Sequence, residues 1–342
     1  MRRRGSGWSA ALTVAAAALS VSVLTMLAAR ANPVLALGAL VGGALGDRFA
    51  LTDTLVKSCP LVLTGLAVAI AFQSGVWNIG AEGQLLVGAL AATAAAAPIA
   101  AWPRPIAIVA TLAAGAGAGG AWAWLAIVLR VRRNVSEVIA TIMLNFVAAN
   151  LVGWAVHGPL MEAGGRYPQS DPLPAATRLP ASTAGLHAGL AIAALAVPFA
   201  WWLLYRTALG FRCRAAGVNA EAARVAGLDP VGAVIAAMVA SGALAGLAGA
   251  IEVSGVTGRL FEQFSGGQGY TAIAVALLAR LHPAGVAAAA LFFGALAAGS
   301  GAMQRTAGVS AVFVAIVQAT VILALLALDA RGRNQRASEA AP

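Results

Sequence analysis

The chain has 342 residues, of which 61% are hydrophobic and 10% charged, and its mean hydropathy is +0.86. A soluble domain of this length could not cover so much apolar surface, so the composition predicts an integral membrane protein and excludes a soluble one. The net charge of +10 would suit nucleic acid, but the arginines lie at the ends of apolar runs, where membrane topology explains them.

Residue types that hold metals or ATP are sparse and scattered. Cys59 and Cys213 lie far apart without CxxC spacing, and the three histidines are equally dispersed, so no metal site or disulfide framework is predicted. The single lysine, Lys57, lacks the glycine-rich sequence of a phosphate-binding loop before it. We therefore expect no cofactor, and any ATP must be bound by another chain.

The N-terminal part of the chain carries two apolar segments of different kinds. Residues 8–29 follow a basic start and are longer than the apolar core of a signal peptide, about 7–15 residues, so we expect a retained first span; a cleaved signal peptide is the alternative. In residues 32–57, Gly38, Gly42 and Gly46 recur every four positions. This segment is read either as an external element packed on the bundle or as a plain amphipathic loop.

The motif Gly75-Val76-Trp77-Asn78-Ile79-Gly80-Ala81-Glu82-Gly83-Gln84 lies between spans expected at 58–76 and 81–101. A charged side chain in hydrocarbon costs roughly 2.5–3.5 kcal/mol on insertion scales, so such residues usually face protein or an aqueous pathway. We expect one helix to end near Gly75 and another to begin at Asn78 or Gly80, with Glu82 in its first turn. The alternative is an ordinary loop at the membrane surface.

Three further spans are expected between residues 106 and 205. Residues 106–129 end in a basic cluster that marks a cytoplasmic end, and a span over 137–156 is capped by Asn134 or Ser136. Within it, Asn145 and Asn150 either bond to neighbouring helices or line a pathway. Residues 157–187 carry five prolines and are predicted to form an exterior loop before a sixth span at 188–205.

The longest internal polar stretch, residues 206–230, is predicted to be cytoplasmic. Asn219 can cap a short helix over 220–226, Gly227 can close that helix in a left-handed conformation, and Asp229 can begin the next span. A short helix lying along the membrane can pass force to a partner. The alternative is a basic loop that only fixes topology.

The remaining apolar segments are predicted at 231–253, 270–281, 283–303 and 308–328. The second is only half a span, and the glycine-rich run before it resembles the broken helices that line transport sites. We therefore expect an all-α integral membrane protein of about 10 transmembrane helices (8 to 10), with broken half-helices, a cytoplasmic coupling helix and both termini in the cytoplasm. Residues 1–342 are expected to form a single transmembrane domain.

Three motifs in order make the chain similar to a known family. The first is the Gly75–Gln84 motif, the second runs from Leu209 to Ala223, and the third is Gly269-Tyr270-Thr271-Ala272-Ile273-Ala274-Val275-Ala276-Leu277-Leu278. Together they resemble the permease family of ABC importers for branched-chain amino acids, simple sugars and nucleosides, closest to the nucleoside (guanosine-type) branch. The family pattern has a glycine near the end of the third motif, where this chain has Ala279-Arg280.

The resemblance implies a transport subunit that is not an enzyme. Its partners would be a cytoplasmic ABC ATPase, a second homologous permease and an extracytoplasmic solute-binding protein, in the bacterial inner membrane. Transport would proceed by alternating access, with ATP hydrolysis on the partner chains. The residues expected to couple to the ATPase are Gly217, Asn219, Glu221, Ala222, Ala223 and Gly227.

The expected cargo is a nucleoside or a similar small polar solute. Such a molecule suits a pathway that combines aromatic surface with neutral hydrogen-bonding groups. The candidate pathway residues are Phe72, Trp77, Asn78, Glu82 and Gln84, of which Glu82 either binds a hydroxyl or stabilises the restarted helix. The alternatives are a ribose-like sugar or branched-chain amino acid permease and, from other classes, an ion-coupled secondary transporter or a membrane-embedded enzyme.

Overall fold

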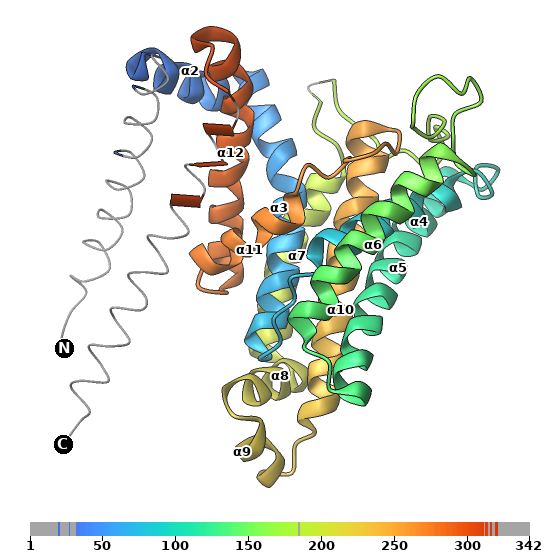
Figure 1. Ribbon diagram of the computed structural model, residues 1–342, viewed down its shortest axis with the longest axis vertical. Coiled ribbons are helices and arrows are strands. Elements are labelled where there is room, and N and C mark those ends of the chain that lie inside the picture. Colours follow the sequence, from blue (N-terminus) through green and yellow to red (C-terminus); the bar gives the residue numbers. More distant parts are fainter. Residues whose placement is uncertain are drawn as a thin grey trace. The chain divides into compact units, whose positions relative to one another are not determined.

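The computed structural model describes residues 20, 27, 32–183, 185–310, 312, 313, 315, 316, 319 and 320 (Figure 1). The helices are α2 (Pro33–Leu45), α3 (Arg48–Gln73), α4 (Ala81–Ala96), α5 (Arg104–Arg133), α6 (Glu137–His157), α7 (Gly189–Arg206), α8 (Ala208–Val218), α9 (Ala220–Val225), α10 (Pro230–Glu252), the π-helix η1 (Val253–Thr257), α11 (Gln268–Leu278) and α12 (Pro283–Ala307). The span predicted at 8–29 and most of the one at 308–328 lie outside the described residues.

Within the described part of the chain, six helices are long and apolar enough to cross a membrane: α3, α5, α6, α7, α10 with η1, and α12. Three shorter apolar helices, α2, α4 and α11, accompany them. An all-helical membrane protein is therefore confirmed. The number of ten spans is not confirmed by these elements and stays a prediction.

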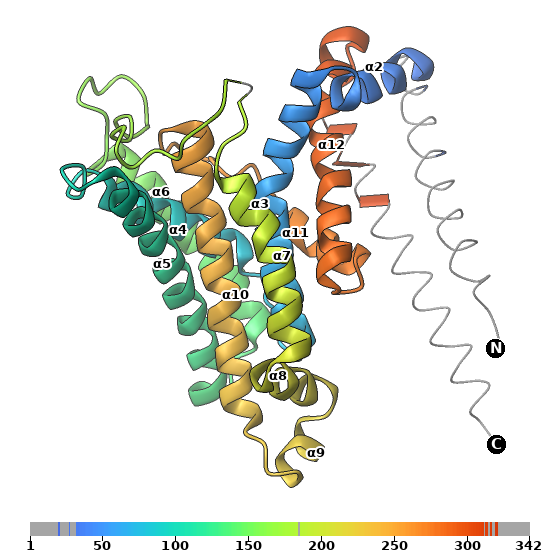
Figure 2. The same ribbon diagram turned by 180° about the vertical axis from the view of Figure 1, so that it is seen from behind.

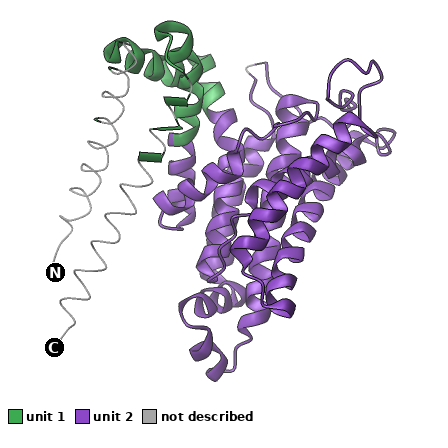
Figure 3. Ribbon diagram, viewed as in Figure 1, with its two compact units in different colours: residues 1–54, 293–342 green, residues 55–292 purple. Residues whose placement is uncertain are grey.

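The chain divides into two compact units (Figure 3). Residues 1–54 and 293–342 make up the first unit, and residues 55–292 make up the second. Helices α3 and α12 each contribute residues to both. The single domain expected over 1–342 stays a prediction.

Unit 1 contains α2, which the sequence presented as either a packed element or a loop. It is a helix of 13 residues, so the loop alternative is wrong. The contact glycine is Gly43, where a Cβ would lie 3.3 Å from the Gly299 Cα and closer still to Ala302. Gly38 and Gly42 have open space around them, so the glycines that recur every four positions are not the ones that bring α2 against α12.

The core of unit 2 is a set of three helices, α4, α5 and α10, whose backbones touch at glycines. A Cβ on Gly88 would meet the backbone of Gly246, and one on Gly119 would meet Gly242 and Gly246. A Cβ on Gly249 would meet the backbone of Leu85. Small residues let helices approach closely where lipid provides no hydrophobic driving force between them. These contacts fix α4 at the centre of the unit.

The two ends of unit 2 differ in character (Figures 1 and 2). The basic end of α5 and the helices α8 and α9 lie at one end, and the loop between α6 and α7 lies at the other. Side-chain caps shape the first end as predicted. Asn219 accepts from the Ala222 N–H, Gly227 has φ +78°, and Asp229 accepts from the Gly232 N–H.

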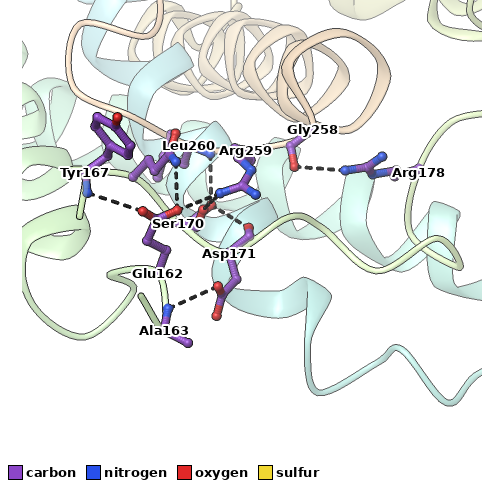
Figure 4. Close-up of polar contacts among 10 residues, drawn as sticks. Glu162, Ala163, Tyr167, Ser170, Asp171, Arg178, Gly258, Arg259 and Leu260 are labelled. Carbon is purple, nitrogen blue, oxygen red and sulfur yellow. Dashed lines mark hydrogen bonds and ion pairs between the residues drawn. The ribbon is translucent and has the colours of Figure 1, made fainter. Parts of the chain in front are cut away.

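The loop of residues 158–188 is fastened to the segment that follows α10. The N–H groups of Ser170, Leu173 and Leu179 donate to carbonyls of Leu260, Gly258 and Ser254, at 2.7–3.0 Å. Figure 4 shows the Glu162 carboxylate paired with Arg259, at 2.8 Å. Leu173 and Leu179 are buried. The prolines therefore do not leave a free loop, because backbone bonds attach it to η1 and its continuation.

The structure decides between two predicted caps and adds two elements that were not predicted. Ser136, one of the two predicted caps, is the N-cap of α6, although its side chain makes no capping bond, whereas Asn134 adopts a left-handed conformation (φ +53°) and closes α5. Helix α8 occupies residues that the sequence presented only as a polar stretch. The π-helix at Val253–Thr257 was not predicted; it adds a wider turn to the end of α10.

Candidate transport site and coupling segment

The helix break predicted at the Gly75–Gln84 motif is present. Helix α3 ends at Gln73, Gly75 turns the chain with φ +77°, and α4 begins at Ala81 with Glu82 in its first turn. The N-cap of α4 is Gly80, which provides no side-chain bond. Instead, the Asn78 side-chain oxygen accepts a hydrogen bond from the Gly80 N–H, at 2.9 Å. This is not an ordinary surface loop, because Asn78 is fully buried.

A hydrogen-bond network of three side chains holds the break against α10. The Asn78 amide donates to the Gln84 carbonyl oxygen at 2.9 Å and to the Ser241 hydroxyl at 2.8 Å, and the Gln84 amide donates back to the Asn78 oxygen at 3.0 Å. Gln84 is 1% exposed. Buried amides lose little when their donors and acceptors are paired in this way. The hydrogen bonds of the two amides therefore stabilise the conformation of the break.

Glu82 connects the break to α11, which lies almost two hundred positions further along the chain. Its carboxylate accepts from the Ser265 hydroxyl and, at 2.7 Å, from the Gly269 N–H in the first turn of α11. The first N–H groups of a helix have no partner within it, and a carboxylate both satisfies them and complements the helix dipole. The glycine at 269 allows this approach, because a Cβ there would meet the backbone of Glu82.

Asn145 of α6 binds the same junction from a third side. Its oxygen accepts from the Gly83 N–H at 2.8 Å, and its amide donates to the Ile79 carbonyl at 2.9 Å and to the Tyr270 hydroxyl at 3.3 Å. Bonding between helices, one of its two predicted roles, is therefore confirmed. Among the residues that the structure describes, Asn150 bonds to the Phe146 carbonyl of its own helix, at 2.8 Å.

An aromatic pair lies on the accessible side of the break. Phe72 and Trp77 lie with ring centroids 4.8 Å apart and planes tilted by 49°. Trp77 is 55% exposed, whereas Asn78, Glu82 and Gln84 are all buried. The structure thus brings the five predicted pathway residues into one region, with Trp77 on its surface, Phe72 half-buried beside it and the polar groups buried.

The six predicted coupling residues lie between the end of α8 and the turn that follows α9. Glu221 and Ala222 are exposed, with Glu221 paired to Arg224, while Ala223 is buried. Gly217 lies near the end of α8 against the helix break, since a Cβ on it would meet the Gln73 carbonyl and lie 2.9 Å from the Gly75 nitrogen. This contact between the two motifs was not predicted.

Two exposed valines in the same segment also escaped the sequence analysis. Val218 is 87% exposed and Val225 is 83% exposed, on either side of α9. Apolar side chains so exposed in a polar segment are typical of a contact surface when they are grouped. The signal that could have found them is a β-branched residue at each end of a short capped helix.

Comparison with known proteins gives a consistent result across the chain. Residues 50–326 match the family model described as branched-chain amino acid transport system / permease component. The chain is 37% identical to the glucose ABC transporter permease protein TsgB13 of Haloferax volcanii, over 95% of this chain and 89% of that protein.

Two bacterial relatives carry nucleoside names. Identity is 34% to the guanosine ABC transporter permease protein NupP of Bacillus subtilis, over 89% of each chain. It is 30% to the nucleoside ABC transporter permease protein NupB of Lactococcus lactis, over 88% of this chain and 86% of that one. No solved structure gives a significant match.

Proposed function

The chain belongs to the permease component family of branched-chain amino acid transport systems, and from that premise we propose that it carries nucleosides through the membrane as part of an ABC importer. The assignment of a nucleoside as the cargo rests on the similarity, along nearly the whole chain, to relatives named for guanosine and nucleosides. The pair of Phe72 and Trp77, of which Trp77 is exposed, supports it, because a nucleobase has a flat face that can stack on such rings. Asn78, Glu82 and Gln84 shape the wall behind them.

In this proposal the transporter works by alternating access. The α8–α9 segment docks on a cytoplasmic ABC ATPase, with Glu221, Ala222 and the two valines in contact. A second, homologous permease completes the pathway, and a solute-binding protein delivers cargo from outside. The chain crosses the inner membrane about ten times, with both termini in the cytoplasm, and α4 and α11 serve as half-helices. ATP is hydrolysed on the partner chains.

A second candidate cargo is glucose or another monosaccharide. It is favoured by the 37% identity to the glucose permease TsgB13, which covers more of the chain than either nucleoside relative. Sugar rings also stack on aromatic side chains, so Phe72 and Trp77 do not separate the two cargoes.

The test is uptake of radiolabelled guanosine, adenosine, uridine, glucose, ribose and leucine by cells with and without this gene and its partners. We expect nucleoside uptake that stops when ATP is depleted and survives an uncoupler. Uptake of glucose without nucleoside uptake or competition would replace the first candidate with the second. Uptake that the uncoupler abolishes while ATP is held constant would refute the ABC importer itself.

A further inference from the structure

Both ends of α11 are attached to the same interrupted segment of the chain. At its start, the Glu82 carboxylate from the first turn of α4 accepts from the Gly269 N–H. After its end, the Gln73 side chain, on the last residue of α3, donates from Nε2 to the Leu281 carbonyl at 2.6 Å. Helix α11 therefore bridges the two sides of the break between α3 and α4.

The Leu281 carbonyl is presented by an unusual backbone. Arg280 and Leu281 adopt left-handed conformations with φ +49° and +61°, and the Leu281 N–H bonds back to the Ala276 carbonyl at 2.9 Å. Residues other than glycine rarely adopt this conformation unless their surroundings hold them there. In this chain, the Gln73 amide is one of the groups that hold the turn.

Helix α8 touches the break at the same residue. Gly217 approaches so closely that a Cβ on it would meet the main-chain oxygen of Gln73. Two residues later, Asn219 caps the start of α9. Gln73 thus contacts α8 through its main chain and the end of α11 through its side chain.

We propose that Gln73 is a positioning residue that makes α11 follow movements of the α8–α9 segment. The inference rests on the proposed function, in which that segment docks on the ATPase. A push on α8 displaces the Gln73 main chain through Gly217, and the Gln73 amide carries the end of α11 with it. Glu82 retains the start of α11, so the half-helix moves as one body with the break.

Contact between neighbours does not by itself measure coupling, so the test is a double-mutant cycle in the full complex reconstituted in vesicles. Gln73→Met keeps the side-chain length and removes the donor. Gly217→Ala separates α8 from the break. Gln73→Met should lower guanosine uptake per ATP hydrolysed by about three- to tenfold, the range that the loss of one hydrogen bond allows. Gly217→Ala should lower it as well, because the added methyl group meets the Gln73 carbonyl. The double variant should be no worse than the more affected single variant.

A second readout does not depend on the cargo. Both native cysteines are buried, so a thiol introduced by Thr271→Cys, a half-buried position of α11 whose hydroxyl bonds to the Gly267 carbonyl one turn earlier, reports on α11. Its labelling rate should change between nucleotide-free and vanadate-trapped complexes, and Gln73→Met should reduce that change. If the parent complex takes up no guanosine, the cargo is wrong while this labelling still tests the link.

Gln304→Met is the matched control, since it makes the same exchange at an exposed position of α12 in unit 1. It should leave uptake per ATP and labelling unchanged, and all variants should retain the ATPase on co-purification. Any of three results would overturn the proposal. These are normal uptake per ATP in Gln73→Met, additive losses in the double variant, and a labelling rate in the parent complex that is the same in the nucleotide-free and vanadate-trapped states.

Discussion

The Glu162 carboxylate ties the loop before α7 to a residue 97 positions away. The side-chain amide of Gln169 and then Arg259 hold the pKa of Glu162 below its ordinary range, with bonds of 2.7 and 2.8 Å. A carboxylate whose pKa is lowered in the folded state stabilises it above the ordinary carboxyl pKa. That contribution is lost as pH falls through the lowered value.

Hydrogen exchange can follow this loss. The N–H groups of Ser170, Leu173 and Leu179, which bond to the segment after α10, should be protected at neutral pH. After correction for intrinsic rates, protection should fall as Glu162 becomes protonated at acidic pH. In Glu162→Gln, protection should be lower at neutral pH and nearly independent of pH. If the parent chain and the variant share one pH profile, the carboxylate does not fasten the loop.

At the scale of helices, the glycines between α5 and α10 give a sharp prediction. A Cβ on Gly119 would lie 2.7 Å from the Gly246 Cα and closer to the Gly242 carbonyl, whereas Gly117 in the same helix has open space. Overpacking a close interface typically costs about 1–3 kcal/mol. Gly119→Ala should therefore lower the thermal stability of the purified complex. The same exchange at Gly117 should leave it unchanged or raise it slightly, because alanine favours a helix by about 0.5–1 kcal/mol.

Equal melting temperatures for these two variants would show that α5 can shift without penalty. The comparison is informative because both variants add one methyl group to the same helix. Only the neighbour differs, and it is backbone in one case and open space in the other. Backbone cannot rotate away as a side chain can.

Prediction from sequence worked where the physics is local. The caps Asn219 and Asp229 and the turn at Gly227 depend on groups within about three residues, and all were predicted. The break at Gly75 followed from polar residues and glycines between apolar runs. The partners of the break were not predictable in the same way, because Ser241 and Ser265 approach from 163 and 183 positions away.

Helix α8 and the turn at Leu281 show the same limit. Helix α8 carries two arginines at its middle, Arg212 and Arg214, and its packing against α7 and α10 makes one side of it an interior. The left-handed turn at Arg280 and Leu281 contains no glycine that would predict it from the sequence, and the amide that bonds to it belongs to α3. Tertiary contacts decide both features, so neither appears in local propensity.

Across unit 2 as a whole, the two ends should face opposite sides of the membrane. The α8–α9 segment and the basic end of α5 lie together, and the fastened loop lies at the far end (Figures 1 and 2). The positive-inside rule assigns the first end to the cytoplasm, where Arg130, Arg132 and Arg133 are grouped. This orientation is what the proposed docking of an ATPase and a binding protein requires.

An impermeant thiol reagent can test the orientation, but not through Cys213. That thiol is 3% exposed and burial raises its pKa, so it should resist labelling from either side. Ser136→Cys, exposed beside the basic end of α5, and Ala175→Cys, exposed in the loop, provide better probes, and the buried native cysteines leave little background. In intact cells Ala175→Cys should label and Ser136→Cys should not, until the membrane is opened. The reverse pattern would mean that the chain has the opposite orientation in the membrane. Labelling of both positions from outside would mean that the two ends of unit 2 do not lie on opposite sides of the membrane.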